Sequence, residues 1–328
     1  MFWRCGNNDS ECKNICRIKN YGYNCYFNSG LQIIARCDKF INEIKIFNKD
    51  NLLYLLNEAI EKILKANYYD PFEFFKFYCE LNNESIRSQN CSQSFIRSLI
   101  KNVNQKYIDY NQKNHLITKI EYNPLNDKDE RNSYLKFINS NHIFPQSKAF
   151  SIFSIISKSY IHGKCMTCHR EIKEYSFHQY IDQNIYLDNI KGKMYFSEVL
   201  KENAGKELAI TLNCPSCHKE NNIKEEVKIV KLPEILIFTL ERNCGFINNV
   251  EIKPDNQIDM KNYIDESLKF GKYLYELFAI NIRYGNHYGH QLCQIKIKGK
   301  WYEINDTIVK INPSINFKDS YGLFYKKI

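Results

Sequence analysis

The sequence predicts an α+β fold, in which helices come first along the chain and strands follow. Apolar residues recur at helical spacing between Leu31 and about Asn104. After Ser151 the pattern changes to short runs that are typical of strands. Helices followed by strands favour segregated layers over a doubly wound parallel sheet.

Each predicted element follows from its own pattern. An apolar stripe with steps of three or four residues predicts a helix over residues 52–64. Pro71 opens a second helix, which is rich in phenylalanine, and a third begins at Ser92. We interpret these stripes as core-facing, and we expect residues 123–132 to form a loop. Strands are predicted over residues 227–230, 235–240, 277–282, 292–297 and 301–304.

Composition and charge favour an intracellular protein without nucleic-acid binding. The 328 residues have a formal net charge of +9, but basic and acidic residues are interleaved, which is typical of a solvated surface. No apolar run approaches the ~18 residues of a membrane span, and residues 1–6 lack the features of a secretion signal. We therefore expect a monomer in the cytoplasm, the nucleus or both. Thiols stay reduced there, and an odd total of 13 cysteines argues further against a disulfide framework.

Two Cys-x-x-Cys pairs form the strongest metal-binding pattern in the chain. They are Cys165 with Cys168, and Cys214 with Cys217. Four thiolates at this spacing can bind one structural zinc ion, and we expect each pair to lie at the tip of a hairpin. Because a histidine follows each pair, haem attachment is an alternative, but haem attachment normally follows export. Cys5, Cys12 and Cys16 have no fourth partner at a standard spacing, so they remain unassigned thiols.

Cys25 is the candidate nucleophile. It follows an Asn-rich turn and precedes an apolar-periodic run, which predicts a position in the first turn of a helix. Free N–H groups and the helix dipole lower the pKa of a thiol there, and they can bind an oxyanion. Asn20, five residues earlier, can donate a further hydrogen bond to that oxyanion. A single cysteine is more often a buried apolar residue, so the prediction requires a base elsewhere in the chain.

His290 is the candidate base, because it shortly precedes a predicted hairpin. A two-residue turn at 298–299 puts Asn305 on the same face of the sheet as His290, and Asp306 on the opposite face. A three-residue turn would exchange Asn305 and Asp306. Cys25, His290 and Asn305 have the order and composition of a papain-like triad, in which the third residue fixes the tautomer of the imidazole.

These motifs together resemble the ubiquitin-specific proteases, from Ile18 to the C-terminus. The segment 18–32 resembles the cysteine box of the family, and the two Cys-x-x-Cys pairs resemble its zinc site. Residues 231–242 resemble a buried palm strand, and residues 289–290 and 301–306 resemble the histidine box. The resemblance implies a papain-like cysteine protease fold with a helical thumb, a β-sheet palm and zinc-tipped β fingers. It implies roles for Cys25 as nucleophile, His290 and Asn305 in the triad, and Asn20 at the oxyanion.

The resemblance also implies a domain plan and an activity. Residues 1–17 form an extension of unknown role, and residues 18–328 form the catalytic domain. The thumb covers about 18–145, and fingers and palm cover about 146–328. The expected reaction is hydrolysis of the isopeptide or peptide bond after the C-terminal glycine of ubiquitin, with one structural Zn²⁺ per chain.

The sequence departs from the family pattern at the thumb helix and beside the catalytic residues. Cys91 and Ser94 replace the acidic residues that in the family meet arginines of the ubiquitin tail, and Gln291 replaces an aromatic residue. Asn24 replaces the threonine before the cysteine. A ubiquitin-like modifier therefore competes with ubiquitin as the expected substrate. The chain could also be a non-catalytic ubiquitin-binding scaffold or a zinc-dependent nucleic-acid binder, although a nucleic-acid binder would need a basic stripe beside the cysteine pairs, and none is present.

Overall fold

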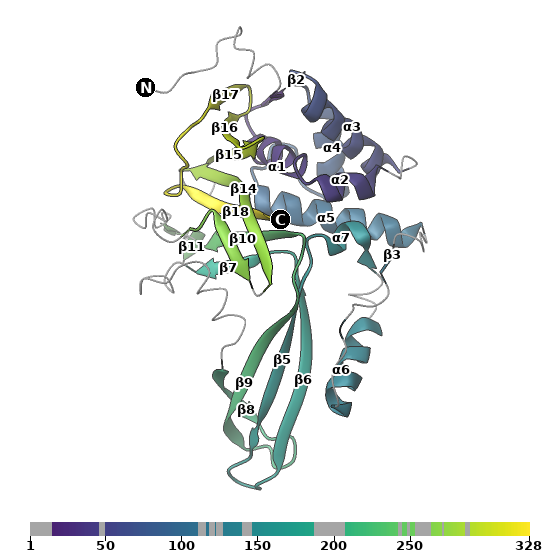
Figure 1. Ribbon diagram of the computed structural model, residues 1–328, viewed down its shortest axis with the longest axis vertical. Helices are drawn as coiled ribbons and strands as arrows, with labels where there is room; N and C mark the ends of the chain where they lie inside the picture. Colours follow the sequence, from purple (N-terminus) through teal and green to yellow (C-terminus); the bar gives the residue numbers. More distant parts are fainter. Residues whose placement is uncertain are drawn as a thin grey trace.

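Helices and strands are segregated in space, as the sequence predicts. The computed structural model describes residues 15–45, 50–110, 116–117, 122, 127–139, 146–186, 207–241, 245–247, 250–252, 264–270, 272–285 and 289–328. Most helices form one layer against a large sheet, and a second, narrow sheet projects away from both (Figure 1). Cys5, Cys12 and most of the predicted extension lie outside the described residues. None of the described helices is long and apolar enough to span a membrane.

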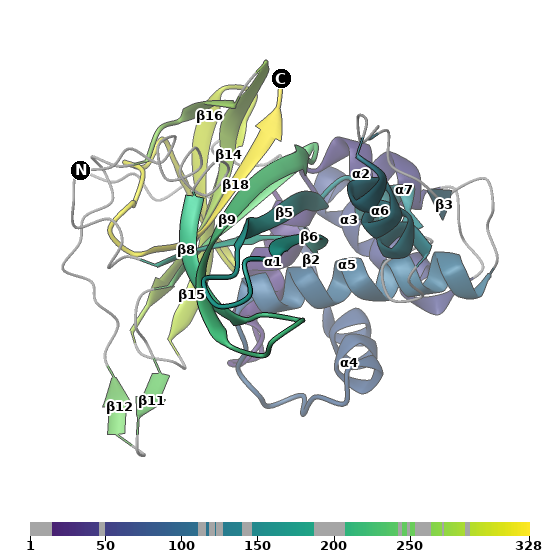
Figure 2. The same cartoon turned by 90° about the horizontal axis from the view of Figure 1, so that it is seen from below.

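The helices are α1 (Cys25–Ile34), α2 (Asp38–Ile44), α3 (Asn51–Lys65), α4 (Phe72–Leu81), α5 (Ser92–Asp109), α6 (Lys128–Asn139) and α7 (Lys148–Ser151). The predicted stripe over residues 52–64 is confirmed as the buried face of α3. The helices predicted at Pro71 and Ser92 are confirmed as α4 and α5. Figure 2 shows α5 running along the helical layer, with α1 between it and the sheet.

The large sheet has the strand order β17-β16-β15-β14-β18-β10-β7, and β13 pairs with β14. Neighbouring strands are antiparallel except β10 and β7. Its strands are β7 (Gln183–Tyr186), β10 (Ile235–Glu241), β13 (Ser267–Phe270), β14 (Tyr273–Tyr284), β15 (His290–Ile297), β16 (Lys300–Asn305), β17 (Ile308–Ile311) and β18 (Ser320–Lys327). The strands predicted from residue 235 onward all lie in this sheet, so those predictions are confirmed.

Alternating side chains place two cores on the two faces of the large sheet. On β10, Ile237 packs into the helical core, whereas Leu236 and Phe238 pack into the core on the other face. This is the period of two that a strand imposes on its side chains. Because the helical core contains residues of α1, α5 and β15, it fixes α1 against β15.

The projecting sheet has the order β6-β5-β9-β8. Its strands are β5 (Ile155–Lys164), β6 (Glu171–Tyr180), β8 (Glu207–Asn213) and β9 (Glu220–Lys231). Shorter pairs complete the structure: β1 (Arg17–Ile18) with β2 (Tyr68–Tyr69), β3 (Leu116–Ile117) with β4 (Gln146–Ser147), and β11 (Gly245–Ile247) with β12 (Val250–Ile252). Each Cys-x-x-Cys pair lies at the tip of a hairpin of the projecting sheet, as predicted.

Helix α6 corrects the expectation of a loop over residues 123–132, because it begins at Lys128. Asp127 explains its start: its Oδ1 accepts hydrogen bonds from the N–H groups of Asp129 and Glu130, at 2.9 and 3.2 Å. The other carboxylate oxygen of Asp127 accepts from Tyr175 on β6, at 2.8 Å. A polar sequence therefore forms a helix because capping and packing against the projecting sheet outweigh its low apolar content.

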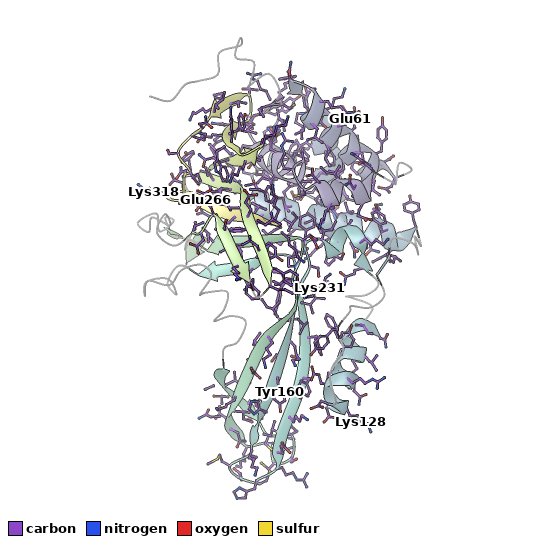
Figure 3. The ribbon with its side chains drawn as sticks, viewed as in Figure 1. Glu61, Lys128, Tyr160, Lys231, Glu266 and Lys318 are labelled. Carbon is purple, nitrogen blue, oxygen red and sulfur yellow. The ribbon has the colours of Figure 1, made fainter. Side chains whose placement is uncertain are left out.

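Lys231 lies where the projecting sheet joins the body of the molecule (Figure 3). Its Nζ donates to the carbonyl oxygen of Ser151 at 3.3 Å. Burial lowers the pKa of Lys231 to about 8, because the charged ammonium loses solvation. The junction between the two sheets is therefore a packed region with a lysine in it.

Candidate active site and metal centre

Cys25 is the first residue of α1, as predicted, and it is 4% exposed. Asn24 precedes it, and its side chain joins the preceding loop to α1: Oδ1 accepts from the N–H of Tyr21 at 2.7 Å, and Nδ2 donates to Lys19 O at 3.2 Å and to Asn28 Oδ1 at 3.0 Å. Asn24 thus shapes the loop and makes no side-chain capping bond to the first turn of α1. No capping side chain therefore occupies the first-turn N–H groups beside the Cys25 thiol.

His290 and Asn305 are brought together across the sheet. The distance from His290 Nε2 to Asn305 Oδ1 is 2.6 Å. Because an amide oxygen can only accept, this contact places the proton on Nε2. A hydrogen bond to the Cys25 side chain is the largest cause that raises the pKa of His290 to about 9, and the Asn305 bond adds to it. The imidazole therefore lies between the thiol and the amide, which is the arrangement of a base with its orienting group.

The register that places Asn305 beside His290 is the predicted one. Ile297 pairs with Lys300, and Cys293 pairs with Ile304. Positive φ values of 49° at Lys298 and 80° at Gly299 form the two-residue turn that this register requires. The predicted hairpin register is confirmed.

The prediction that Asp306 points to the face of the sheet opposite to His290 is wrong. Its φ of 53° takes it out of the strand geometry, so the period of two no longer applies. One of its carboxylate oxygens lies 3.8 Å from His290 Nε2. Its two oxygens accept from Asn20 Nδ2 and Asn28 Nδ2, each at 2.7 Å. Burial raises the pKa of Asp306, and the two amides act against that rise. The sequence pattern predicted neither this role of Asp306 nor the contact with Asn28.

Asn20 belongs to the same cluster of side chains. Its Oδ1 accepts from the N–H of Gly22 at 2.7 Å, and its Nδ2 donates to Asp306. Gly22 has a φ of 94°, which glycine adopts without strain. A primary amide carries two protons, so Asn20 keeps one N–H for a further acceptor while Asp306 and Gly22 fix its orientation.

The residues that replace the acids of the thumb helix occupy its N-terminal capping positions. Cys91 is the N-cap of α5, and its Sγ accepts from the N–H of Ser94 at 3.3 Å. The Cys91 thiol lies 2.9 Å from the Ser94 hydroxyl. The Cys91 thiol therefore binds the backbone N–H and the hydroxyl of Ser94 across the first turn, and neither side chain carries the charge of an acidic residue.

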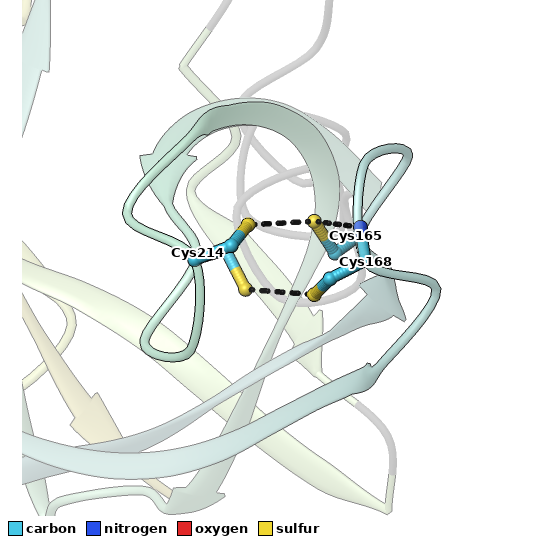
Figure 4. A group of neighbouring side chains, drawn as sticks. Cys165, Cys168 and Cys214 are labelled. Carbon is cyan, nitrogen blue, oxygen red and sulfur yellow. Dashed lines mark hydrogen bonds between the residues drawn. The ribbon is translucent and has the colours of Figure 1, made fainter.

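The four cysteines of the two predicted pairs form one cluster at the tip of the projecting sheet (Figure 4). Their sulfur atoms all lie within 4.8 Å of one another, and the four residues are free thiols. The Sγ atoms of Cys165 and Cys217 are 3.5 Å apart, and those of Cys168 and Cys214 are 3.7 Å apart. The cluster can hold a metal ion.

Backbone hydrogen bonds favour the ionised form of two of these thiols, Cys165 and Cys214, whereas the pKa of Cys217 is raised to about 11 because a backbone hydrogen bond from Lys219, which lowers it, is outweighed by burial and the neighbouring thiols. The N–H of Cys168 donates to Cys165 Sγ at 3.4 Å, and that hydrogen bond is the largest cause that lowers the pKa of Cys165 to about 6. The N–H of Ser216 donates to Cys214 Sγ at 3.4 Å, and backbone hydrogen bonds lower the pKa of Cys214 as well. Thiolates are the form that binds metal ions.

Comparisons with known proteins agree with the fold. The chain is 24% identical over 349 residues to probable ubiquitin carboxyl-terminal hydrolase 4 of Schizosaccharomyces pombe, covering 94% of this chain and 58% of that protein. It is 32% identical over 127 residues to ubiquitin carboxyl-terminal hydrolase 10 of Arabidopsis thaliana, covering 35% of this chain and 14% of that protein. The chain thus spans less than two thirds of the length of these relatives.

Two solved structures share the fold. The SAGA Ubp8/Sgf11/Sus1/Sgf73 DUB module bound to ubiquitin aldehyde matches with a TM-score of 0.66 and 18% identity, over 99% of this chain and 72% of that chain. A yeast SAGA DUB module with an Sgf73 mutant matches with a TM-score of 0.67 and 17% identity, over 98% and 70%. These matches confirm the predicted fold class, with a helical thumb, a β-sheet palm and β fingers that end in the cysteine cluster. The family model for ubiquitin carboxyl-terminal hydrolase matches residues 16–325, and the chain belongs to that family.

Proposed function

We propose that this chain is a cysteine hydrolase that cleaves the bond after the C-terminal glycine of ubiquitin. The observation that carries the proposal is the position of His290, which bonds to Asn305 and faces the Cys25 thiol at the start of α1. The thumb covers about residues 18–145, and fingers and palm cover about 146–328. The protein acts as a monomer in a reducing, intracellular compartment.

Acylation begins when His290 takes the proton of the Cys25 thiol, which gives a thiolate beside an imidazolium. The thiolate attacks the carbonyl carbon of the terminal glycine, and the carbonyl oxygen becomes an oxyanion. The first-turn N–H groups of α1 and the remaining N–H of Asn20 stabilise that oxyanion, one such donor contributing about 3 kcal/mol. His290 then gives its proton to the leaving amine, the C–N bond breaks, and a thioester remains on Cys25.

Deacylation uses the same groups in reverse order. His290, now neutral, takes a proton from water, and the resulting hydroxide attacks the thioester carbonyl. The C–S bond breaks, Cys25 returns to the thiolate beside an imidazolium, and the tail leaves as a carboxylic acid that releases its proton to solvent. Asn305 holds the ring in the tautomer that both steps need, and Asp306 holds Asn20 toward the oxyanion.

Zinc is the metal that the cysteine cluster fits best. Four ligands at about 2.3 Å around a tetrahedral ion stand roughly 3.8 Å from each other, close to the Sγ distances of 3.5 and 3.7 Å. Cys165, Cys168, Cys214 and Cys217 would hold the ion, leaving no open position. The ion would join the β5–β6 hairpin to the β8–β9 hairpin and stabilise the fingers.

Hydrolysis of a ubiquitin C-terminal fluorogenic amide tests the proposal. We expect turnover by the wild type and at least a thousandfold loss in Cys25→Ala, because the nucleophile is removed. Asn222→Ala, in the fingers far from Cys25, is the matched control and should retain turnover. Absence of turnover in the wild type, or full turnover in Cys25→Ala, contradicts the proposal.

A ubiquitin-like modifier is the second candidate substrate. The observation that favours it is the uncharged pair Cys91 and Ser94 at the cap of α5. A substrate tail without arginines would suit that uncharged turn. A panel of fluorogenic modifier amides separates the two candidates: preference for ubiquitin supports the first, and preference for another modifier supports the second.

A further inference from the structure

Gln291 follows His290 on β15 and bonds to the thumb helix with both ends of its amide. It is 2% exposed. Its Oε1 accepts from the backbone N–H of Ser92 at 2.9 Å, and its Nε2 donates to the carbonyl oxygen of Asn90 at 2.6 Å. Residues 90 and 92 flank the N-cap of α5. Gln291 therefore binds the start of the thumb helix to the residue next to the candidate base.

Asn281 on β14 extends this contact into a buried network. Its Nδ2 lies 2.9 Å from the Ser29 hydroxyl on α1 and 3.1 Å from the Ser92 hydroxyl on α5. Its Oδ1 accepts from Gln93 Nε2 at 3.2 Å. Asn281 and Ser92 are both fully buried. Because a buried polar group without its partner is costly, such a network holds its members in one arrangement.

The network compensates for a weak cap on α5. The side chain at the N-cap is the Cys91 thiol, and a thiol accepts hydrogen bonds poorly. Cys91 binds only the N–H of Ser94, and the N–H of Ser92, at the first position of the helix, is bound by Gln291, 199 residues away in sequence. The start of the thumb helix is thus capped from the strand that carries His290.

We propose that Gln291 is a positioning residue, which holds the first turn of α5 at a fixed place beside Cys25 and His290. Gln291 and Cys25 line the same small hollow between α1 and β15. The statement that the first turn of α5 contacts the substrate tail rests on the proposed function. Holding the turn in place before the tail arrives lowers the ordering cost of binding, so Gln291 acts on substrate affinity.

Hydrogen exchange at the Ser92 amide tests the structural part without any substrate. We compare the wild type with Gln291→Met, which keeps the length of the side chain and removes both polar atoms. Gln294→Met is the matched control, because Gln294 is also buried on β15 but bonds to Glu303 and Ser314 O. We expect Ser92 to exchange at least tenfold faster in Gln291→Met and unchanged in Gln294→Met. Unchanged exchange in Gln291→Met, or equal acceleration in both variants, overturns the proposal.

Steady-state kinetics on the ubiquitin amide test the positioning part. We expect KM to rise about tenfold in Gln291→Met, with kcat within threefold of the wild type and the alkaline pKa of the pH profile unchanged. An unchanged KM together with faster exchange at Ser92 would mean that Gln291 stabilises the first turn of α5 without affecting substrate affinity. That result overturns the proposal. A fall in kcat with a shifted pH profile would mean that Gln291 acts on His290, which also overturns it. If the wild type hydrolyses no modifier amide, the proposed function fails, and hydrogen exchange still decides whether Gln291 holds α5.

Discussion

Removal of the Asn305 side chain should lower the pKa of His290. Asn305 Oδ1, 2.6 Å from His290 Nε2, accepts a hydrogen bond that stabilises the imidazolium. Hydrogen bonds to charged groups contribute roughly 1.5–3 kcal/mol. The His290 side chain is 40% exposed, so solvent screening favours the lower end of that range. At about 1.4 kcal/mol per pH unit, Asn305→Ala should lower the pKa of His290 by about one unit.

The lower pKa of His290 in Asn305→Ala determines how the dependence of kcat/KM on pH changes. A pKa of about 9 keeps His290 largely protonated at neutral pH, as the acid of the acylation step. A pKa one unit lower leaves roughly a third as much imidazolium at pH 8.5, so the alkaline limb of kcat/KM should move down by about one unit.

Two assays measure the shift independently. NMR titration of the His290 ring reports the pKa without substrate, and kcat/KM against pH on the ubiquitin amide reports its use in catalysis. Asn222→Ala is the matched control, because Asn222 lies in the fingers, where its Oδ1 accepts from the Thr211 hydroxyl at 3.0 Å. An unchanged or raised pKa of His290 in Asn305→Ala would refute the reasoning.

The remaining predictions concern stability and metal content. Asp306→Ala removes one hydrogen-bond acceptor from each of the side-chain amides of Asn20 and Asn28, although Asn28 Nδ2 still donates to Lys19 O, and it should lower the free energy of unfolding by about 2 kcal/mol in urea titration; an unchanged value contradicts the role of Asp306. Gly30→Ala places a Cβ 2.3 Å from Phe95 Cδ1, and the overpacking should cost about 1–3 kcal/mol by the same measurement; no loss would show that α1 and α5 can separate. Cys214→Ser removes one of four thiolates, so metal analysis should find less than about a tenth of the wild-type zinc; full zinc content would exclude the cluster as the site.

Local pattern predicted those parts of the fold that local physics determines. The spacing of apolar residues identified α3, and Lys298 with Gly299 identified the turn that sets the β15–β16 register. The spacing of the cysteine pairs predicted two hairpin tips, and both are present.

Long-range contacts decided the parts that the sequence did not predict. Helix α6 depends on Asp127, whose carboxylate both caps it and contacts the fingers. Asp306 leaves the strand geometry at a positive φ, and its carboxylate accepts from Asn20 and Asn28, which lie 286 and 278 positions away in sequence. The bond between Gln291 and Ser92 joins residues 199 positions apart, and no local spacing indicates it. The roles of Cys25, His290, Asn305 and Asn20 remain predictions that the geometry supports.

Covalent capture by ubiquitin with a C-terminal electrophile tests the central claim most directly. The account predicts a single adduct of one ubiquitin per chain, mapped by peptide mass spectrometry to Cys25, and its loss in Cys25→Ala. The Cys91→Ala variant is the matched control, since Cys91 is a thiol on the neighbouring α5 cap, and it should still form the adduct. No adduct on the wild type, or an adduct that persists in Cys25→Ala, would contradict the account.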